Sequence, residues 1–336
     1  DTAYPYHSAG IDGNGNSEVF IGKFLKENSY RDDVLISTKS PCWLMEEKGD
    51  FEYYLDKQLE KLQTDSIDIY LLHALTKDDW DKIRKLRVLD FLDDSLSSGK
   101  IKHVGFSSHT EIDTFVDILD AYPKWEVVLT QMNYLDEYYQ TGVMGLDELK
   151  RLNIGSMIME PLRGGRLVQN ISPEVQKLWD SAEVKRTPVE WALEYLWNRD
   201  DVDCVLSGMN SLEQVRQNIQ IASDVKEISE HDHDVIREVA RTYKTLTGND
   251  CTSCGYCMPC PEDVDIINCF KEYNIGKMLN NPKGSALQYF TLIDDDCRAD
   301  SCINCGECEF VCPQMLDIPQ ELEKVDEYFG REFNHF

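Results

Sequence analysis

Eight of the twelve cysteines lie in two short blocks in the last quarter of the sequence. The blocks read Cys251-Thr-Ser-Cys254-Gly-Tyr-Cys257-Met-Pro-Cys260-Pro and Cys302-Ile-Asn-Cys305-Gly-Glu-Cys308-Glu-Phe-Val-Cys312-Pro. Three cysteines at two-residue gaps can surround one corner of an iron–sulfur cube, and a fourth precedes a proline. This spacing predicts two 4Fe–4S clusters. Zinc usually takes two separated pairs of ligands, and disulfides need an oxidising compartment, so both alternatives fit less well.

A second set of residues could deliver a proton to a carbonyl group. A tyrosine is a weak acid with a pKa of about 10, and a neighbouring ammonium favours its phenolate. Lys39 could make Tyr6 a proton donor in this way, while Asp1 would pair with Lys39 and keep it charged. His73 would orient the carbonyl oxygen or relay the proton. A buried structural ion pair beside a tyrosine is the alternative interpretation of the same residues.

Short apolar runs and helical patterns alternate over residues 1–225. Strands are expected over 33–39, 67–73, 101–107, 127–133, 155–160 and 202–207, and helices over 52–62, 80–96, 111–122, 146–152, 188–197 and from 211 onward. This alternation predicts a parallel sheet covered by helices. Polar residues lie at the C-terminal end of every predicted strand, and in a (β/α)8 barrel these ends form the rim that carries the active site. A doubly wound sheet would need a ligand site at one switch point only. We therefore expect an α/β TIM barrel, with an N-terminal strand missing from this sequence.

Composition and length limit the remaining possibilities. The 336 residues, 42% of them hydrophobic, suffice for one large domain and one small domain. We expect a barrel over 1–225, a charged helical connector over 226–250, and a small, mostly helical cysteine domain over 251–336 with a closing helix. The net charge of −28 argues against nucleic acid and membrane surfaces as partners. No apolar run reaches the length of a membrane span, and reduced thiols indicate the cytoplasm.

Several marks in residues 1–225 resemble the aldo-keto reductase family. They include Asp1-Thr-Ala-Tyr-Pro-Tyr6, Ser17-Glu18, Ser37-Thr-Lys39, Tyr70-Leu-Leu-His73, Gly105-Phe-Ser-Ser108, Gln131-Met-Asn133, Pro161-Leu-Arg-Gly-Gly165 and Gly208-Met-Asn-Ser211. The resemblance implies an enzyme that reduces aldehydes or ketones with NAD(P)H. It implies that Tyr6 is the general acid and that the other catalytic residues are Asp1, Lys39 and His73.

The same resemblance implies a nicotinamide dinucleotide lying across the barrel mouth. The implied binding residues are Ser107, Ser108 and Gln131 for the carboxamide, Leu162, Gly164, Gly165 and Arg166 near the pyrophosphate, and Gly208, Met209, Gln214 and Asn218 at the adenosine end. Met159 stands where the family often has an aromatic residue against the nicotinamide. A basic residue for a 2′-phosphate is absent beside Gly208, although Arg216 is near in sequence. Both NADP and NAD therefore stay open.

The cysteine blocks resemble the bacterial-type ferredoxin module with two 4Fe–4S clusters. In that module the fourth cysteine of each block ligates the other cluster. The implied ligand sets are therefore Cys251, Cys254, Cys257 and Cys312 for one cluster, and Cys260, Cys302, Cys305 and Cys308 for the second. The first block has two residues instead of three before its fourth cysteine, so Cys269 and Cys297 are alternatives to Cys260.

The cofactors expected in the barrel and in the cysteine domain transfer different numbers of electrons. A nicotinamide transfers two electrons as hydride, whereas a 4Fe–4S cluster carries one. In one interpretation, the protein is a carbonyl reductase with an appended electron-transfer or regulatory module. In a second, a flavin or another mediator in the barrel links the substrate to a ferredoxin or flavoprotein partner. In a third, the chain is a non-catalytic electron carrier or scaffold. The first interpretation takes a small carbonyl compound as the substrate.

Overall fold

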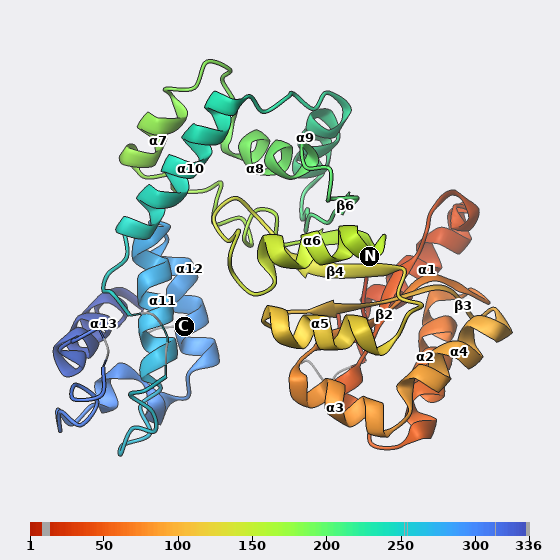
Figure 1. Ribbon diagram of the computed structural model, residues 1–336, viewed down its shortest axis with the longest axis horizontal. Coiled ribbons are helices and arrows are strands. Elements are labelled where there is room, and N and C mark those ends of the chain that lie inside the picture. Colours follow the sequence, from red (N-terminus) through yellow and green to blue (C-terminus); the bar gives the residue numbers. More distant parts are fainter. Residues whose placement is uncertain (9–13, 252, 254, 313, 334–336) are drawn as a thin grey trace. The chain divides into compact units, whose positions relative to one another are not determined.

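Six parallel strands form one sheet in the computed structural model, which describes residues 1–8, 14–251, 253, 255–312 and 314–333. The strands are β1 (Ser37–Ser40), β2 (Ile67–Leu75), β3 (Ile101–Ser108), β4 (Val127–Gln131), β5 (Gly155–Met159) and β6 (Cys204–Val205). They pair in chain order from β1 to β6 without a reversal (Figure 1). A doubly wound sheet reverses its strand order at the switch point. The predicted α/β fold, wound as in a barrel, is therefore confirmed.

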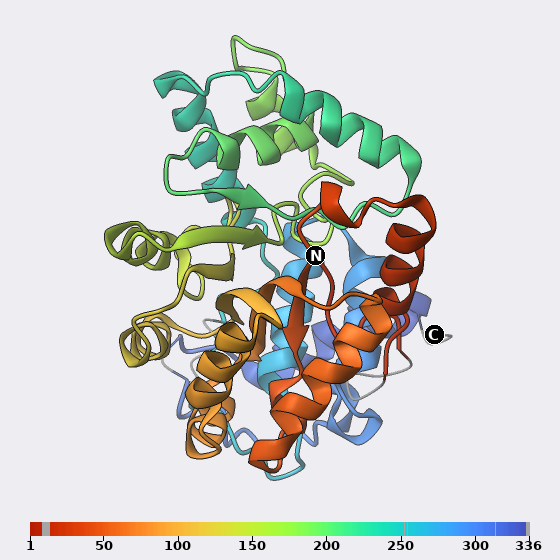
Figure 2. The same cartoon turned by 90° about the vertical axis from the view of Figure 1, so that its right-hand side faces the viewer.

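Helices connect the strands and cover the sheet (Figure 2). They are α1 (Ser17–Asn28), α2 (Lys48–Leu62), α3 (Lys77–Lys85), α4 (Val88–Ser98), α5 (Ile112–Ala121), α6 (Gly142–Leu152), α8 (Pro188–Trp197) and α9 (Leu212–Ser223). Crossovers between parallel strands are right-handed, so a strand order without reversal puts the connecting helices on one face. The other face is left for the strand side chains that line the interior.

The prediction of a single helix over 80–96 is wrong. The chain forms α3 and α4 instead, because Arg87 adopts a left-handed conformation with φ 64° that ends one helix and begins the next. Trp80 is buried from α3 and Phe91 from α4. Helix α1 was not predicted from the sequence, because its exposed Phe20 and Phe24 interrupt the amphipathic pattern.

The inner face of the sheet carries both apolar and polar side chains. Lys39 pairs in register with Leu71, and successive side chains alternate between faces. Leu71, Leu129 and Met157 form a buried cluster on this face. Gly105 lies between them in the sheet, and a Cβ added there would come within 1.9 Å of the Val127 carbonyl oxygen. By the same alternation, the side chains of Lys39, Ser107 and Gln131 lie on this inner face, at the C-terminal ends of their strands.

The cysteine blocks belong to a helical part of the chain. Its helices are α7 (Pro173–Trp179), α10 (Glu230–Thr245), α11 (Ile266–Met278), α12 (Pro282–Leu292) and α13 (Ile318–Phe333). The closing helix expected in the cysteine domain is observed as α13. By packing, the chain divides into one unit of residues 1–161 and 192–226 and a second of 162–191 and 227–336. Within the described ranges, no helix has the length and apolar character needed to cross a membrane.

Candidate active site and cysteine cavities

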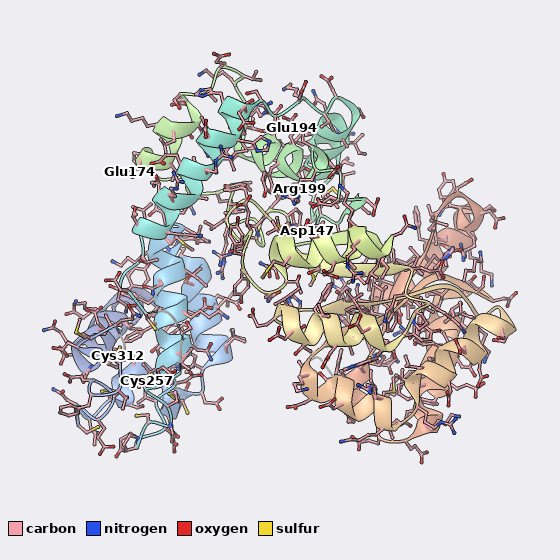
Figure 3. The ribbon with its side chains drawn as sticks, viewed as in Figure 1. Asp147, Glu174, Glu194, Arg199, Cys257 and Cys312 are labelled. Atoms are coloured by element: carbon pink, nitrogen blue, oxygen red, sulfur yellow. The ribbon has the colours of Figure 1, made fainter. Side chains whose placement is uncertain are left out.

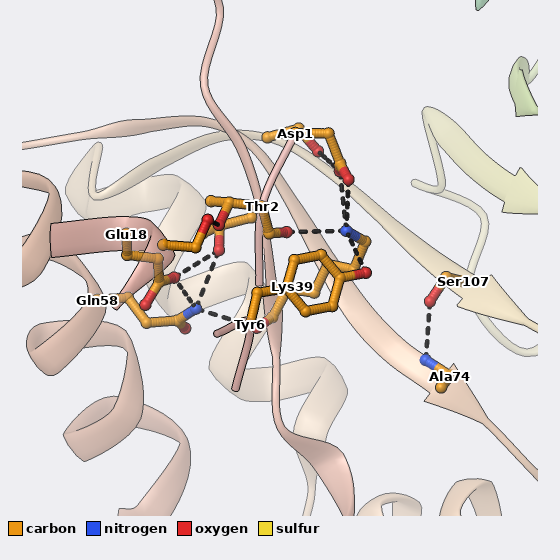
Figure 4. A network of polar contacts seen from close by, with 11 residues as sticks. Asp1, Thr2, Tyr6, Glu18, Lys39, Gln58, Ala74 and Ser107 are labelled. Atoms are coloured by element: carbon orange, nitrogen blue, oxygen red, sulfur yellow. Dashed lines mark hydrogen bonds and ion pairs between the residues drawn. The ribbon is translucent and has the colours of Figure 1, made fainter. Parts of the chain in front are cut away.

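Lys39 is the centre of a polar cluster at the end of β1 (Figure 4). Its side chain is 1% exposed, and its Nζ lies 2.9 and 2.8 Å from the two carboxylate oxygens of Asp1. The ammonium also donates to the Thr2 carbonyl oxygen at 2.8 Å and to the Tyr6 hydroxyl at 3.4 Å. Tyr6 itself is 39% exposed. The buried ammonium therefore contacts a phenol that remains accessible from solvent.

His73 belongs to the same cluster and is held in a neutral state. Its ring packs edge-on against the Tyr6 ring, with the two centroids 5.8 Å apart. The ring of Trp43, which follows β1 in the chain, has its centroid 5.3 Å from that of His73. Burial, followed by the charge of Lys39, lowers the pKa of His73 to about 3. Its buried Nδ1 has no hydrogen-bond partner among the described residues. A neutral imidazole carries one N–H group, which can donate a hydrogen bond to an oxygen.

We expect His73 to act without titrating. Since its pKa is far below the assay range, the pH profile of kcat/KM from pH 5 to 9 should contain no ionisation that belongs to this residue. His73→Gln should therefore lower kcat/KM by a similar factor at every pH. Steady-state rates across that range provide the measurement. A limb near pH 6.5 that is present in the parent protein and lost in His73→Gln would contradict the assignment.

The residues implied for the carboxamide lie at the ends of β3 and β4. Ser107 shares the inner face with Gln131, and its hydroxyl accepts a bond from the Ala74 amide at 2.7 Å. Gln131 donates to Asp136 at 3.1 Å. Ser108 lies on the helix-covered face by strand alternation, where its hydroxyl bonds Thr110 at 2.6 Å. The structure therefore brings Ser107 and Gln131 to the inner face and separates Ser108 from them.

The remaining residues implied for the dinucleotide fall in both packing units. Leu162, Gly164, Gly165 and Arg166 belong to the second unit, and Gly208, Met209, Gln214 and Asn218 to the first. Gly164 and Gly165 have φ values of 64° and 86°, which glycine adopts without strain. Arg166 reaches the carbonyl oxygen of Gly284 at 3.5 Å.

The adenosine-end residues surround the turn from β6 into α9. The Asn218 amide donates to Ser207 at 3.0 Å, and the Gln214 side chain accepts from the Asn210 amide at 2.9 Å. An added Cβ at Gly208 would meet open space. The turn is therefore tied to the first two turns of α9 by side-chain hydrogen bonds, with an open side at its glycine.

Sequence reasoning missed two parts of this site. Trp43 follows β1 within a short 3-10 helix and covers His73, and an aromatic residue directly after a strand end was the available signal. Glu18 and Gln58 are fully buried polar residues beneath β1. Glu18 appeared only as a family mark, and no pattern in the sequence singled out Gln58.

Seven of the eight predicted cluster cysteines line two cavities of the second unit. Cys260, Cys302, Cys305 and Cys308 line the first cavity, and Cys251, Cys257 and Cys312 line the second. Figure 3 labels Cys257 and Cys312 in this part of the chain. Cys254 lies outside the described residues, and Cys257 also reaches the first cavity. Cys260 of the first block thus lines a cavity with three cysteines of the second block, and Cys312 of the second block lines one with Cys251 and Cys257 of the first.

Two matching positions of the cysteine blocks are left-handed in both blocks. Ser253 and Gly255 have φ values of 57° and 80°, and the matching Asn304 and Gly306 have 57° and 75°. In the first block, the Ser253 amide donates to the Cys251 sulfur at 3.4 Å. Left-handed residues of this kind turn the chain tightly and expose amide groups to anions. Thiolates in such loops fit an iron–sulfur cluster by the chemistry of their donors.

The two alternative cysteines lie apart from these cavities. Cys269 is fully buried on α11, and burial raises the pKa of its thiol to about 12. Cys297 lies in a short 3-10 helix, and neither residue lines the two cavities. Among the residues that the structure describes, no group of three or more His, Cys, Asp or Glu side chains is arranged to hold a single metal ion. Cys260 lines the first cavity with Cys302, Cys305 and Cys308, and Cys257 reaches it as well.

A parallel sheet paired in chain order, with Lys39 and His73 at the C-terminal ends of its strands, is typical of the (β/α)8 barrel fold. Comparison with protein families leads to the same class. The Aldo/keto reductase family matches residues 1–241, and a 4Fe-4S dicluster domain matches residues 250–321. The chain belongs to the aldo/keto reductase family and is an oxidoreductase with a C-terminal 4Fe–4S dicluster domain. Both predicted resemblances are confirmed.

Individual relatives match the barrel part of the chain. L-galactose dehydrogenase of Arabidopsis thaliana is 26% identical over 243 residues, covering 66% of this chain and 74% of its own. NADH-specific methylglyoxal reductase of Escherichia coli is 24% identical over 275 residues, covering 67% and 80%. The aldo-keto reductase AKR11C1 from Bacillus halodurans, in its holo form, has a TM-score of 0.54 at 25% identity, covering 66% and 76%.

Proposed function

We propose that the protein reduces the carbonyl group of a small aldehyde or ketone with hydride from NAD(P)H, using Tyr6 as the general acid. The observation that carries this proposal is the contact of the Tyr6 hydroxyl with a buried lysine. Lys39 lies 3.4 Å from that hydroxyl and is held by both oxygens of Asp1. An ammonium at this position stabilises the phenolate that remains after proton transfer.

The other polar residues near Lys39 would orient the substrate and the dinucleotide. His73, held neutral, would orient the carbonyl oxygen beside the Tyr6 hydroxyl. Ser107 and Gln131 would hold the nicotinamide carboxamide from the inner face. When bound, the nicotinamide would supply the hydride and the clusters would carry single electrons. The names of the relatives, a sugar dehydrogenase and a methylglyoxal reductase, support a small polar carbonyl compound as the substrate.

The C-terminal module is proposed to hold two 4Fe–4S clusters in the crossed arrangement. Cys251, Cys254, Cys257 and Cys312 would hold one cluster, and Cys260, Cys302, Cys305 and Cys308 the other. The distribution of the described cysteines between two cavities supports this set. Thiolate ligands of iron need a reducing compartment, which favours the cytoplasm.

One observation favours the ferredoxin-linked alternative. Cys305, which lines the first cavity, is exposed. An exposed ligand would let a one-electron partner, such as a ferredoxin or a flavoprotein, approach that cluster. A flavin or another mediator in the barrel would then be needed to join one-electron to two-electron chemistry.

Anaerobically purified protein tests these proposals directly. We expect iron and sulfide for two clusters per chain, no flavin, and oxidation of NADPH or NADH that depends on an added aldehyde. The same aldehyde-dependent oxidation should survive in folded Cys305→Ser protein. Bound flavin, or cluster reduction on addition of NAD(P)H, would instead support the ferredoxin-linked reaction. Folded protein with no activity toward a broad panel of aldehydes and ketones would contradict the reductase proposal.

A further inference from the structure

Glu18 is a buried carboxylate directly behind the strand that carries Lys39 (Figure 4). It lies in the first turn of α1 and is 0% exposed. The Oε1 atom of Glu18 accepts two hydrogen bonds, one from the Thr38 hydroxyl at 2.5 Å and one from the Gln58 side-chain amide at 2.7 Å. Thr38 is the neighbour of Lys39 in β1, with its side chain on the opposite face. Glu18 therefore bonds β1 on the face opposite Lys39, whose side chain points into the site.

Gln58 connects the same carboxylate to two strands. From α2, its amide donates to the Thr38 hydroxyl at 3.2 Å and to the Lys39 carbonyl oxygen at 3.0 Å. Its own carbonyl oxygen accepts a bond from the Tyr70 hydroxyl at 2.9 Å. Tyr70 pairs in register with Thr38 and lies three residues before His73. The hydrogen bonds of Gln58 thus reach both strands that carry Lys39 and His73.

The N-terminal segment is tied to Glu18 by charge. The Lys61 ammonium lies 2.6 Å from the second carboxylate oxygen of Glu18 and donates to the Tyr4 carbonyl oxygen at 3.2 Å. Its side chain is 8% exposed, so the ion pair is buried. Ser17, next to Glu18, accepts a bond from the Thr2 hydroxyl at 2.8 Å. The segment fastened in this way is the one that carries Asp1 and Tyr6.

From these contacts we propose that Glu18 is a positioning residue of the active site, which sets the place and charge of the Lys39 ammonium relative to Tyr6. The inference rests on the proposed function. Replacing a buried ion pair by apolar residues is often neutral or stabilising, so stability alone is a weak reason for a buried carboxylate at this point. Geometry at the reacting groups is a stronger one, because a displacement of about 1 Å can cost roughly 10²-fold in rate.

Electrostatics supports the same role. Burial lowers the pKa of the Lys39 ammonium, whereas the Tyr6 oxygen and the Glu18 carboxylate act in the opposite direction. The charged or titratable groups around Lys39 are Asp1 and Tyr6 from the N-terminal segment, Glu18 from α1 and His73 from β2. Without the negative charge of Glu18, Lys39 should lose its proton at lower pH.

Glu18→Gln provides the test, with Glu27→Gln on the same helix as the matched control. Glu27 is exposed and its carboxylate lies 3.9 Å from the Lys23 ammonium in a surface pair. We expect Glu18→Gln to lower kcat about 10²-fold and to move the alkaline limb of the kcat profile to lower pH. Glu27→Gln should change neither quantity. A folded Glu18→Gln protein with the rate and alkaline limb of the control would overturn the proposal, and so would a lower rate with an unmoved limb.

A second variant keeps the inference testable if Glu18→Gln does not fold. Thr38→Val removes one hydroxyl that bonds Glu18 and leaves the Glu18–Lys61 ion pair in place. We expect a smaller loss of kcat with the dissociation constant for the dinucleotide unchanged, and unaltered kcat would count against the proposal. The two levels of proposal fail differently. If Tyr6→Phe retains full activity, the proposed role of Tyr6 as the general acid is wrong, whereas loss in Tyr6→Phe with none in Glu18→Gln or Thr38→Val rejects only this inference.

Discussion

Tyr6→Phe should abolish carbonyl reduction while leaving the fold and the dinucleotide site intact. The substitution removes only the hydroxyl that lies 3.4 Å from the Lys39 ammonium. A positioned general acid contributes typically ~10²–10⁴-fold to a rate, and we expect a loss toward the upper end, since Tyr6 is the only hydroxyl that Lys39 contacts among the described residues. The aromatic ring and its packing against His73 remain. The measurement is the aldehyde-dependent oxidation of NADPH or NADH at saturating dinucleotide.

A matched control separates this effect from changes at the surface. Tyr53 is another exposed tyrosine of the same unit and lies on α2. Tyr53→Phe should retain the full rate, and both variants should bind the dinucleotide with the affinity of the parent protein. Unchanged turnover in Tyr6→Phe would show that another group protonates the carbonyl oxygen.

Cys260→Ser should remove one of the two clusters, and Cys297→Ser should remove neither. Cys260 lines the cavity that also holds Cys302, Cys305 and Cys308, whereas Cys297 lines neither cavity. A serine hydroxyl is a poor substitute for a thiolate ligand, because iron–sulfur clusters are held by cysteine thiolates. The expected result is about half of the parent iron and sulfide in Cys260→Ser. Iron and sulfide analysis of anaerobically prepared protein provides the measurement, supported by the electron paramagnetic resonance spectrum after reduction.

Cys297→Ser is a close control for this experiment. It is half-buried, as Cys260 is, and belongs to the same helical module. Its thiol pKa is raised by burial and by neighbouring carboxylates of Asp294 and Asp263, an environment that disfavours a thiolate. If iron falls in Cys297→Ser and stays complete in Cys260→Ser, the shortened gap of the first block has moved the fourth ligand to the later cysteine.

Local patterns were sufficient for most of the fold. Each predicted strand overlaps an observed one, because β-branched and apolar runs between turns describe buried parallel strands well. The helices predicted over 188–197 and from 211 onward are observed as α8, which begins at Pro188, and α9, which Ser211 caps. The single helix predicted over 80–96 failed at Arg87, since a left-handed residue in mid-segment depends on how α3 and α4 pack. Propensity gives no signal for that choice.

Side-chain partners were harder to predict than backbone elements. The pairing of Lys39 with Asp1 was expected from residue types, and the structure has it at 2.8 Å. The neutral state of His73 was not, because its pKa depends on burial under Trp43 and Tyr6 and on the nearby Lys39 charge. Desolvation arises only when distant segments close over a group, so residue type alone does not reveal it.

The sequence by itself determined the family, the alternation of strands and helices, and which cysteines belong to the two blocks, because each of these depends on spacing along the chain. Tertiary structure decided which groups lie on the face of β1 opposite the Lys39 side chain. Glu18, Gln58 and Lys61 are separated by up to 43 residues and meet only where α1 and α2 pack against β1. It also decided that Cys260 faces the cysteines of the second block while Cys269 is buried in the core. Contacts between distant segments are products of packing, and no local pattern carries them.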